Sequence, residues 1–361
     1  MSRKKINYVS SKKVMSMSAR FNIILGAWAN GKSYAVKTGC VEACYKSKNK
    51  LALIRRLDKE DTDANAENYF LDCPVETITG GEYDGIVCYR KILYFAKYNN
   101  DTAKWERGQV LGRRFSLYES YQTKSGVFQN FDFAVFEEFV TLDRYLNKEV
   151  YRLMRLISTI SRNDAIRVYM VGNTITPLCP YYREFQIHPE KQKPGTIDKY
   201  TMHNPETNED VSIWVYMTEP LNKKNGMFFG NIAKEADGGA FHTETHAHGE
   251  FDDIIECDIL HTVVFVYEGY KFLARFIRDP KNNHYWYVEP KTSEIQKNTR
   301  TVGQLQSMSK YHTKQLDPIN ANERALFDYL KIGKIAYSDN LTGTLFLQAL
   351  KGIENAGAQF D

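Results

Sequence analysis

The chain has 361 residues, which is long for one domain and natural for two, and 43% of them are hydrophobic. No apolar run approaches the roughly 18 residues that a membrane span needs, and the first residues lack the apolar segment of a signal peptide. We therefore expect neither a membrane protein nor a secreted one. The scattered cysteines, without a C-x-x-C pair, suggest reduced thiols in the cytoplasm.

The positive charge is concentrated in the first half of the chain. The net charge is only +4, but residues 1–200 carry 32 Lys and Arg against 22 Asp and Glu. Residues 1–20 hold six basic side chains and no acidic one, which suits a solvated arm or a tail that contacts nucleic acid or another subunit. A polyanionic partner is thus plausible for this half.

The first informative stretch is Gly26–Ser33, which matches G-x-x-x-x-G-K-[ST] at every fixed position. Residues 21–25 before it form a short apolar run typical of a buried strand, and residues 33–45 after it suit a helix. A strand, a glycine-rich loop and a helix in this order predict a P-loop that binds ATP. The residues expected to contact the nucleotide here are Gly26, Ala27, Trp28, Ala29, Asn30, Gly31, Lys32, Ser33 and Tyr34.

The P-loop residues have distinct expected roles. Gly26 and Gly31 let backbone N–H groups turn toward phosphate oxygens, and the helix N-terminus adds partial positive charge. Lys32 is expected to reach the β- and γ-phosphates, and the hydroxyl of Ser33 to ligate Mg²⁺.

A second apolar run, residues 133–136, ends in two glutamates. A buried parallel strand that presents carboxylates at its C-terminal end is what a Walker B element requires. Glu137 is expected to hold the hydration shell of Mg²⁺, and Glu138 to orient and deprotonate the attacking water. Asp is commoner at the first position, and Glu is one methylene longer.

Residues 142–160 then suit an amphipathic helix, and residues 168–174 suit a further buried strand. Asn173 and Thr174 at the end of that strand could sense the γ-phosphate. A strand placed between the P-loop strand and the Walker B strand is the mark of the additional-strand (ASCE) class, so we predict an α/β P-loop NTPase of this class. Short β-type runs within residues 75–118 predict an antiparallel insertion in its sheet.

Composition suggests three parts: an ATPase domain over residues 1–200, a linking subdomain over 201–245, and a smaller α/β domain over 246–361. The last part is predicted to form strands at 263–267, 272–278 and 284–288, followed by helices that include 320–330. His242, His246, His248 and His261 could be metal ligands, but without a cysteine pair surface histidines are the simpler interpretation.

These motifs, in this order and spacing, resemble the DNA-encapsidation ATPases of small short-tailed phages with protein-primed linear genomes, relatives of terminase large subunits. The resemblance covers residues 20–200 through Gly26–Ser33, Phe133–Glu138 and Val171–Thr174. It implies a homo-oligomeric ring, usually of five subunits, that docks on the portal of an empty capsid in the infected host and translocates double-stranded DNA. An RNA or protein adaptor to the portal is left open.

The resemblance also implies an RNase H-like C-terminal domain. The strand that would carry the catalytic Asp of a nuclease ends instead in Tyr267 and Glu268, so we expect a nuclease relic used for docking. It places a trans-acting arginine finger near Arg162, with Arg155 and Arg167 as competitors. Sequence-independent DNA binding would use phosphate contacts. The first candidate is Lys124 and the second is Arg56, with Arg55, Arg113 and Arg114 as further candidates.

Two other functions compete with DNA translocation. A small-molecule phosphotransferase would need a compact acceptor pocket and gives no reason for the basic insertion or the appended domain. A non-catalytic, nucleotide-gated adaptor conflicts with the intact Lys32, Ser33, Glu137 and Glu138. Stimulation of ATP hydrolysis by DNA separates the three.

Overall fold

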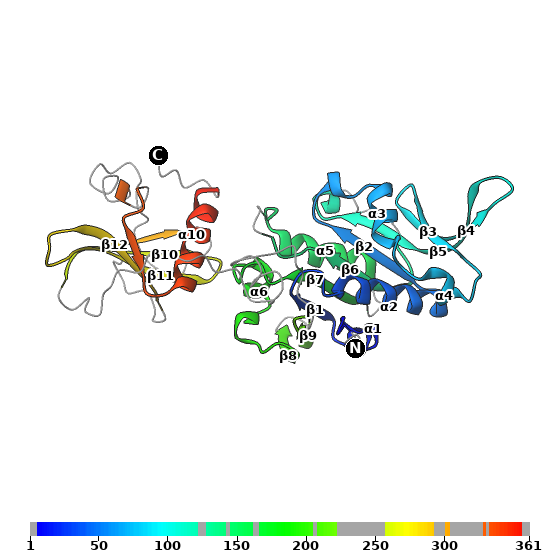
Figure 1. The fold of residues 1–361 in the computed structure, drawn as a ribbon, viewed down its shortest axis with the longest axis horizontal. Coiled ribbons are helices and arrows are strands. Elements are labelled where there is room, and N and C mark those ends of the chain that lie inside the picture. The colour runs from blue at the N-terminus through cyan, green and yellow to red at the C-terminus, as the bar shows by residue number, and fades with distance from the viewer. Residues whose placement is uncertain are drawn as a thin grey trace, which may run out of the picture. The chain divides into compact units, whose positions relative to one another are not determined.

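The computed structural model describes residues 6–121, 128–141, 145–161, 166–204, 208–221, 257–291, 300–303, 328–329 and 332–355. The chain forms two compact units (Figure 1). The first comprises Met1–Ile175 and Glu184–Phe241, and the second comprises Thr176–Arg183 and His242–Asp361. None of the described helices is long and apolar enough to cross a membrane.

The first unit is built on a nine-stranded sheet with the order β3-β4-β5-β2-β6-β7-β1-β9-β8. Six neighbouring strands, from β5 to β9 in this order, run parallel. The other three, β3, β4 and β8, are antiparallel to their neighbours. In chain order the strands are β1 (Phe21–Gly26), β2 (Lys50–Arg55), β3 (Gly85–Tyr89), β4 (Ile92–Asn99), β5 (Lys104–Ser116), β6 (Phe131–Glu137), β7 (Arg167–Asn173), β8 (Ile197–Asn204) and β9 (Glu209–Met217).

This strand order confirms the predicted fold class. β7 lies between β1, which leads into the glycine-rich loop, and β6, which ends in Glu137. The antiparallel insertion is also confirmed, because β3 and β4 extend the sheet beyond β5. Parallel strands with polar ends place those ends along one edge of the sheet, and this arrangement positions the candidate site.

Helices and short 3₁₀ turns connect these strands. They are α1 (Ser11–Met15), α2 (Lys32–Ser47), η1 (Asp58–Glu60), α3 (Asp63–Phe70), α4 (Val75–Thr79), η2 (Tyr118–Tyr121), α5 (Glu149–Ser161), α6 (Pro180–Glu184) and η4 (Pro189–Lys191). α5 begins at Glu149, later than the predicted residue 142. The Glu149 carboxylate accepts a 2.8 Å hydrogen bond from the Leu146 N–H, in the segment that leads into the helix.

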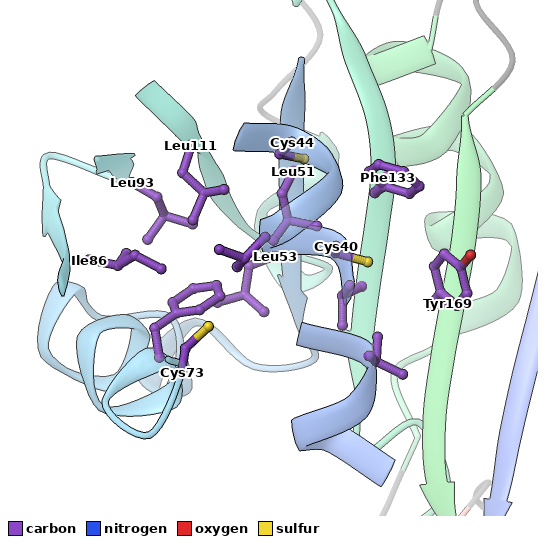
Figure 2. Packing of buried hydrophobic residues seen from close by; sticks show 14 of the residues in the cluster. Cys40, Cys44, Leu51, Leu53, Cys73, Ile86, Leu93, Leu111, Phe133 and Tyr169 are labelled. Atoms are coloured by element: carbon purple, nitrogen blue, oxygen red, sulfur yellow. The ribbon is translucent and has the colours of Figure 1, made fainter. Parts of the chain in front are cut away.

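The core of this unit lies between α2 and the sheet. All six residues of β1 are buried, as expected of a central parallel strand covered on both faces. Figure 2 shows apolar side chains of α2, β2 and the insertion packed together, with Phe133 of β6 and Tyr169 of β7 at the other side of α2. Cys40, Cys44 and Cys73 belong to this cluster as free buried thiols.

The boundary near residue 200 differs from the sequence analysis. β9 lies within the stretch expected to be a linking subdomain. It pairs in parallel with β1, from Phe21 opposite Ile213 to Leu25 opposite Met217. β8 completes the edge as the antiparallel partner of β9. The apolar run at 213–217 is buried almost throughout, which explains why it joins the sheet. Polar neighbours on both sides hide this run in the sequence.

The second unit is a smaller α/β unit, as expected. Its five strands have the order β13-β10-β11-β12-β14. They are β10 (Asp258–Tyr267), β11 (Tyr270–Arg278), β12 (His284–Pro290), β13 (Thr301–Gly303) and β14 (Ile335–Tyr337). Helix α10 (Asn340–Asn355) packs on this sheet, where Phe346 meets the rings of Phe265 and Phe272 at centroid distances of 5.0 and 5.5 Å. Of the predicted helix 320–330, all but residues 328 and 329 lie outside the described residues.

Candidate functional site

The glycine-rich loop joins β1 to α2 in the predicted way. Gly31 precedes the helix with φ 87°, a conformation that favours glycine. Gly26 has φ 150°, and a Cβ there would lie 1.8 Å from the Thr218 hydroxyl oxygen, so no other residue fits. The loop borders a cavity of about 310 Å³ lined by residues 28–34, Glu137, Glu138 and residues 171–173. Trp28, Ala29 and Tyr34 are the exposed members of the loop region.

Lys32 is folded into the loop. Its ammonium donates hydrogen bonds to the carbonyl oxygen of Gly26 and the side-chain oxygens of Asn30 and Asn173, each at 3.1 Å, and to the carbonyl oxygen of Ala27. Burial lowers the pKa of Lys32 to about 7, and the nearby charge of Glu137 offsets this only in part. The ammonium therefore occupies a place where further negative charge, such as a phosphate, would stabilise it.

Glu137 ends β6 beside the loop. It is buried, and its two oxygens have different partners: the Ser33 hydroxyl donates to Oε2 at 2.8 Å, and the Tyr69 hydroxyl donates to Oε1 at 2.7 Å. Burial raises the pKa of Glu137, although the two hydrogen bonds and the positive charge of Arg55 oppose the shift. The predicted pair of metal-binding side chains, Ser33 and Glu137, is thus in direct contact.

Glu138 follows in a left-handed conformation with φ 55° and an exposed side chain. For a residue with a Cβ this conformation is unfavourable, and it persists only where the surroundings impose it. Arg56 does so here: its guanidinium donates to the carbonyl oxygens of Glu138 at 3.0 Å and Phe139 at 2.7 Å. The same guanidinium is held by both oxygens of Glu149 at 3.1 Å.

The end of β7 meets the loop as predicted. Asn173 is in register with Gly26 and contacts Lys32, and the Thr174 N–H donates to the Gly26 carbonyl oxygen at 3.3 Å. The sequence analysis therefore placed these two polar residues at the right strand end. That they sense the γ-phosphate of a bound nucleotide stays a prediction.

Sequence analysis missed the support that β9 gives to the loop. The Thr218 hydroxyl, just past β9, donates to the Leu25 carbonyl oxygen at 2.9 Å and accepts from the Asn30 amide at 2.6 Å. Asn30 in turn contacts Lys32, so Thr218 is linked to the ammonium through one side chain. The apolar run at 213–217 is the sequence signal that predicts this strand, and with it the position of Thr218.

The residues proposed to contact DNA differ in how exposed they are. Arg56 and Arg114 are buried: Arg56 is held by Glu149, and Arg114 pairs with Asp61 at 2.7 Å and with Asp63 at 2.8 Å. Their burial does not fit the predicted phosphate contacts and gives both arginines a structural role instead. Lys124 and Arg162 lie outside the described residues.

The other two arginines in that set are half-buried. Arg55 lies over the Tyr69 ring at 5.1 Å and borders a cavity of about 440 Å³ together with Glu137 and Glu138, which places it beside the candidate site. Arg113 lies over the rings of Phe115 and Phe128 at 5.8 and 5.7 Å. Of the competitors for the arginine finger, Arg167 lies over the Phe133 ring at 4.8 Å.

The alternative metal site falls mostly on residues that the structure does not describe. His242, His246 and His248 lie outside the described residues. Among the described residues, the one group of three possible metal-ligating side chains is Asp58, Asp61 and Glu119, which does not include His261. Arg114 and Lys91 form ion pairs with members of that acidic group and so balance its charge.

Comparison with known proteins agrees with this geometry. Residues 3–212 match the family described as Podovirus DNA encapsidation protein (Gp16). The DNA packaging proteins of Bacillus phages PZA and phi29 are each 25% identical over 190 residues, covering 52% of this chain and 52% of each relative. The chain thus spans about half the length of the curated relatives it matches.

Solved structures share the fold. A chain of the bacteriophage Phi-29 viral genome packaging motor assembly matches with a TM-score of 0.61 at 16% identity, over 96% of this chain and 99% of that one. The Phi-28 gp11 DNA packaging motor matches with a TM-score of 0.55 at 14% identity, over 95% and 98%. At these identities the likeness concerns the fold alone. From the family match, which spans more than half of its length, the chain belongs to the podovirus DNA encapsidation protein (Gp16) family.

Proposed function

We propose that this chain is an ATP-hydrolysing subunit of a viral genome-packaging motor that translocates double-stranded DNA into a procapsid. The observation that carries the proposal is the convergence of Lys32, Ser33, Glu137 and Asn173 on one sheet edge. Lys32 and Ser33 begin α2, after the loop that follows β1, and Glu137 and Asn173 end the neighbouring parallel strands β6 and β7. Family membership directs the proposal to DNA packaging, and the relatives, which are DNA packaging proteins, agree with it.

The residues present fit a magnesium–nucleotide complex. Ser33 and Glu137 offer hydroxyl and carboxylate oxygens 2.8 Å apart, which are the hard ligands that Mg²⁺ prefers. When bound, Mg²⁺ would neutralise charge on the β- and γ-phosphates. The backbone N–H groups of the loop and the α2 N-terminus would bind the same phosphates.

The other side chains would then act on the γ-phosphate and on water. Lys32 would exchange its carbonyl partners for phosphate oxygens while Asn173 remains within reach of it. Glu138, exposed at the cavity, would orient the attacking water and accept its proton. Arg56 would keep Glu138 in place through the backbone carbonyl oxygen.

The remaining assignments follow from family membership and stay proposals. The subunits would form a ring, of five copies in our proposal, docked on the viral portal in the cytoplasm of the infected host, directly or through an RNA or protein adaptor. Arg162 would enter the neighbouring subunit's site as the arginine finger. Lys124 and the half-buried Arg55 and Arg113 remain the candidates for DNA phosphate contacts.

The proposal is tested by measuring ATP hydrolysis with and without random duplex DNA, alongside the mass of the oligomer. We expect hydrolysis that DNA stimulates in an oligomer, and DNA binding that weakens steeply with salt. ATP consumption indifferent to DNA, with the γ-phosphoryl group transferred to a small molecule in place of water, would favour the phosphotransferase. Nucleotide binding without turnover under any condition would favour the adaptor.

A further inference from the structure

The candidate metal-binding carboxylate is held from two sides by two different elements. Ser33, from the first turn of α2, donates to Oε2 of Glu137, and Tyr69, from the last turn of α3, donates to Oε1. We propose that Tyr69 is a positioning residue for Glu137, which fixes the carboxylate so that Oε2 faces the Ser33 side, where Mg²⁺ binds. This inference rests on the proposed nucleotide site and adds to it a residue that none of its motifs contains.

The Tyr69 ring is itself held firmly. The Lys37 ammonium lies 4.9 Å from the ring centroid, and the Arg55 guanidinium lies 5.1 Å from it. Lys37 also donates to the Tyr69 carbonyl oxygen at 2.6 Å, and the Phe70 ring packs edge-on at 4.9 Å. Cations near an aromatic face attract it, and here they come from α2 and from the end of β2. The hydroxyl is therefore presented from a rigid position.

A glutamate at this position needs such support more than an aspartate does. Its side chain has one more rotatable bond, so a buried Glu137 can turn its oxygens in more ways and loses more conformational freedom when it is ordered. Two donors that approach separate oxygens at 2.7 and 2.8 Å select one orientation. Partners that orient a metal ligand in this way typically change metal affinity by about 10- to 100-fold.

α3 also forms part of a cavity at this place. Asn68 and Tyr69 line the cavity of about 440 Å³ that includes Ser33, Glu137 and Glu138. The Tyr69 hydroxyl thus lies at the border of the site that would hold the nucleotide and its metal.

The test is the magnesium dependence of nucleotide binding, measured without turnover. In a Glu138→Gln background, binding of a fluorescent ATP analogue is titrated with Mg²⁺, and separately measured in EDTA. We expect Tyr69→Phe to raise the Mg²⁺ concentration for half-saturation by about 10-fold, with the affinity in EDTA unchanged. The matched control is Tyr45→Phe, which removes a hydroxyl that donates to Glu82, away from the cavity residues, and should change neither value.

A second pair of variants tests the contact itself. Glu137→Asp shortens the side chain and withdraws the carboxylate from Tyr69, so adding Tyr69→Phe to it should shift the magnesium midpoint by less than about two-fold. An unchanged or lowered midpoint in Tyr69→Phe alone would overturn the inference, and so would loss of the EDTA affinity. If the parent Glu138→Gln protein binds no nucleotide at all, the proposed function fails and not the role of Tyr69.

Discussion

The strands β6 and β10 end in the same way, yet their glutamates have different surroundings. Each is followed by a glutamate in left-handed conformation, Glu138 with φ 55° and Glu268 with φ 47°. Glu138 borders the cavity that includes Lys32, whereas Glu268 forms a 2.8 Å ion pair with Arg183, and its side chain is only 12% exposed. An apolar run followed by an acidic residue is therefore not by itself specific for a catalytic glutamate. The groups around the glutamate determine what it can do.

The largest expected difference between the two strand ends is in turnover. Glu138→Gln should reduce ATP hydrolysis by about 10³-fold while nucleotide still binds, because an amide cannot accept the proton of water. Glu268→Gln should leave hydrolysis unchanged. Steady-state ATPase assays and binding of a fluorescent ATP analogue measure both. If Glu268→Gln abolished hydrolysis as completely as Glu138→Gln, the distinction between the two strand ends would be lost.

The arginines at the two ends should differ in what they contribute to stability. Arg56→Ala leaves Glu149 buried and uncompensated, so the free energy of unfolding should fall by about 3 kcal/mol. Arg183 has a 38% exposed side chain, so water can partly replace it beside Glu268, and Arg183→Ala should cost less than Arg56→Ala. Urea denaturation of the full chain compares them. Equal and small losses would show that the Glu138 backbone does not depend on Arg56.

Nucleotide affinity gives a third contrast. Lys32→Ala should weaken ATP binding by about 10- to 100-fold, since it removes a charged donor to the phosphates. Arg183→Ala, beside the other glutamate, should leave the affinity unchanged. Isothermal titration with a non-hydrolysable ATP analogue measures both. Unaltered affinity in Lys32→Ala would count against the P-loop assignment.

The smallest effect is expected from the support behind the loop. Thr218→Val keeps the shape of the side chain but removes the hydrogen bonds to Leu25 and Asn30. Each such bond contributes about 1 kcal/mol to the folded state, and we expect about half of the total, or about five-fold, to appear as lost ATP affinity. The same titration checks it, with Thr342→Val in α10 as the control in the second unit. No change would mean that Lys32 is positioned without β9.

What could be predicted from the sequence depended on how local the signal is. Gly26–Ser33 and the Glu137–Glu138 pair are continuous patterns, and the fold brings them together because parallel strand ends share an edge. Other contacts of the site join elements that are far apart in the chain. They are those of Tyr69 and of Thr218, and the ion pair of Arg56 with Glu149. The spacing of residues in the sequence does not predict such contacts. From the sequence alone, a charged residue at a strand end is equally consistent with a DNA contact and with a buried ion pair.

The pairing of β9 with β1 also bears on how this chain can be made and divided. β1 ends at residue 26, but both of its neighbours, β7 and β9, come from residues beyond 166. Contacts of such sequence separation form slowly, because a long loop must close first. A fragment that stops at residue 200, as composition alone would suggest, would leave one side of β1 with unpaired N–H and C=O groups. Such an edge invites aggregation, so expression of the first unit alone should extend past residue 217.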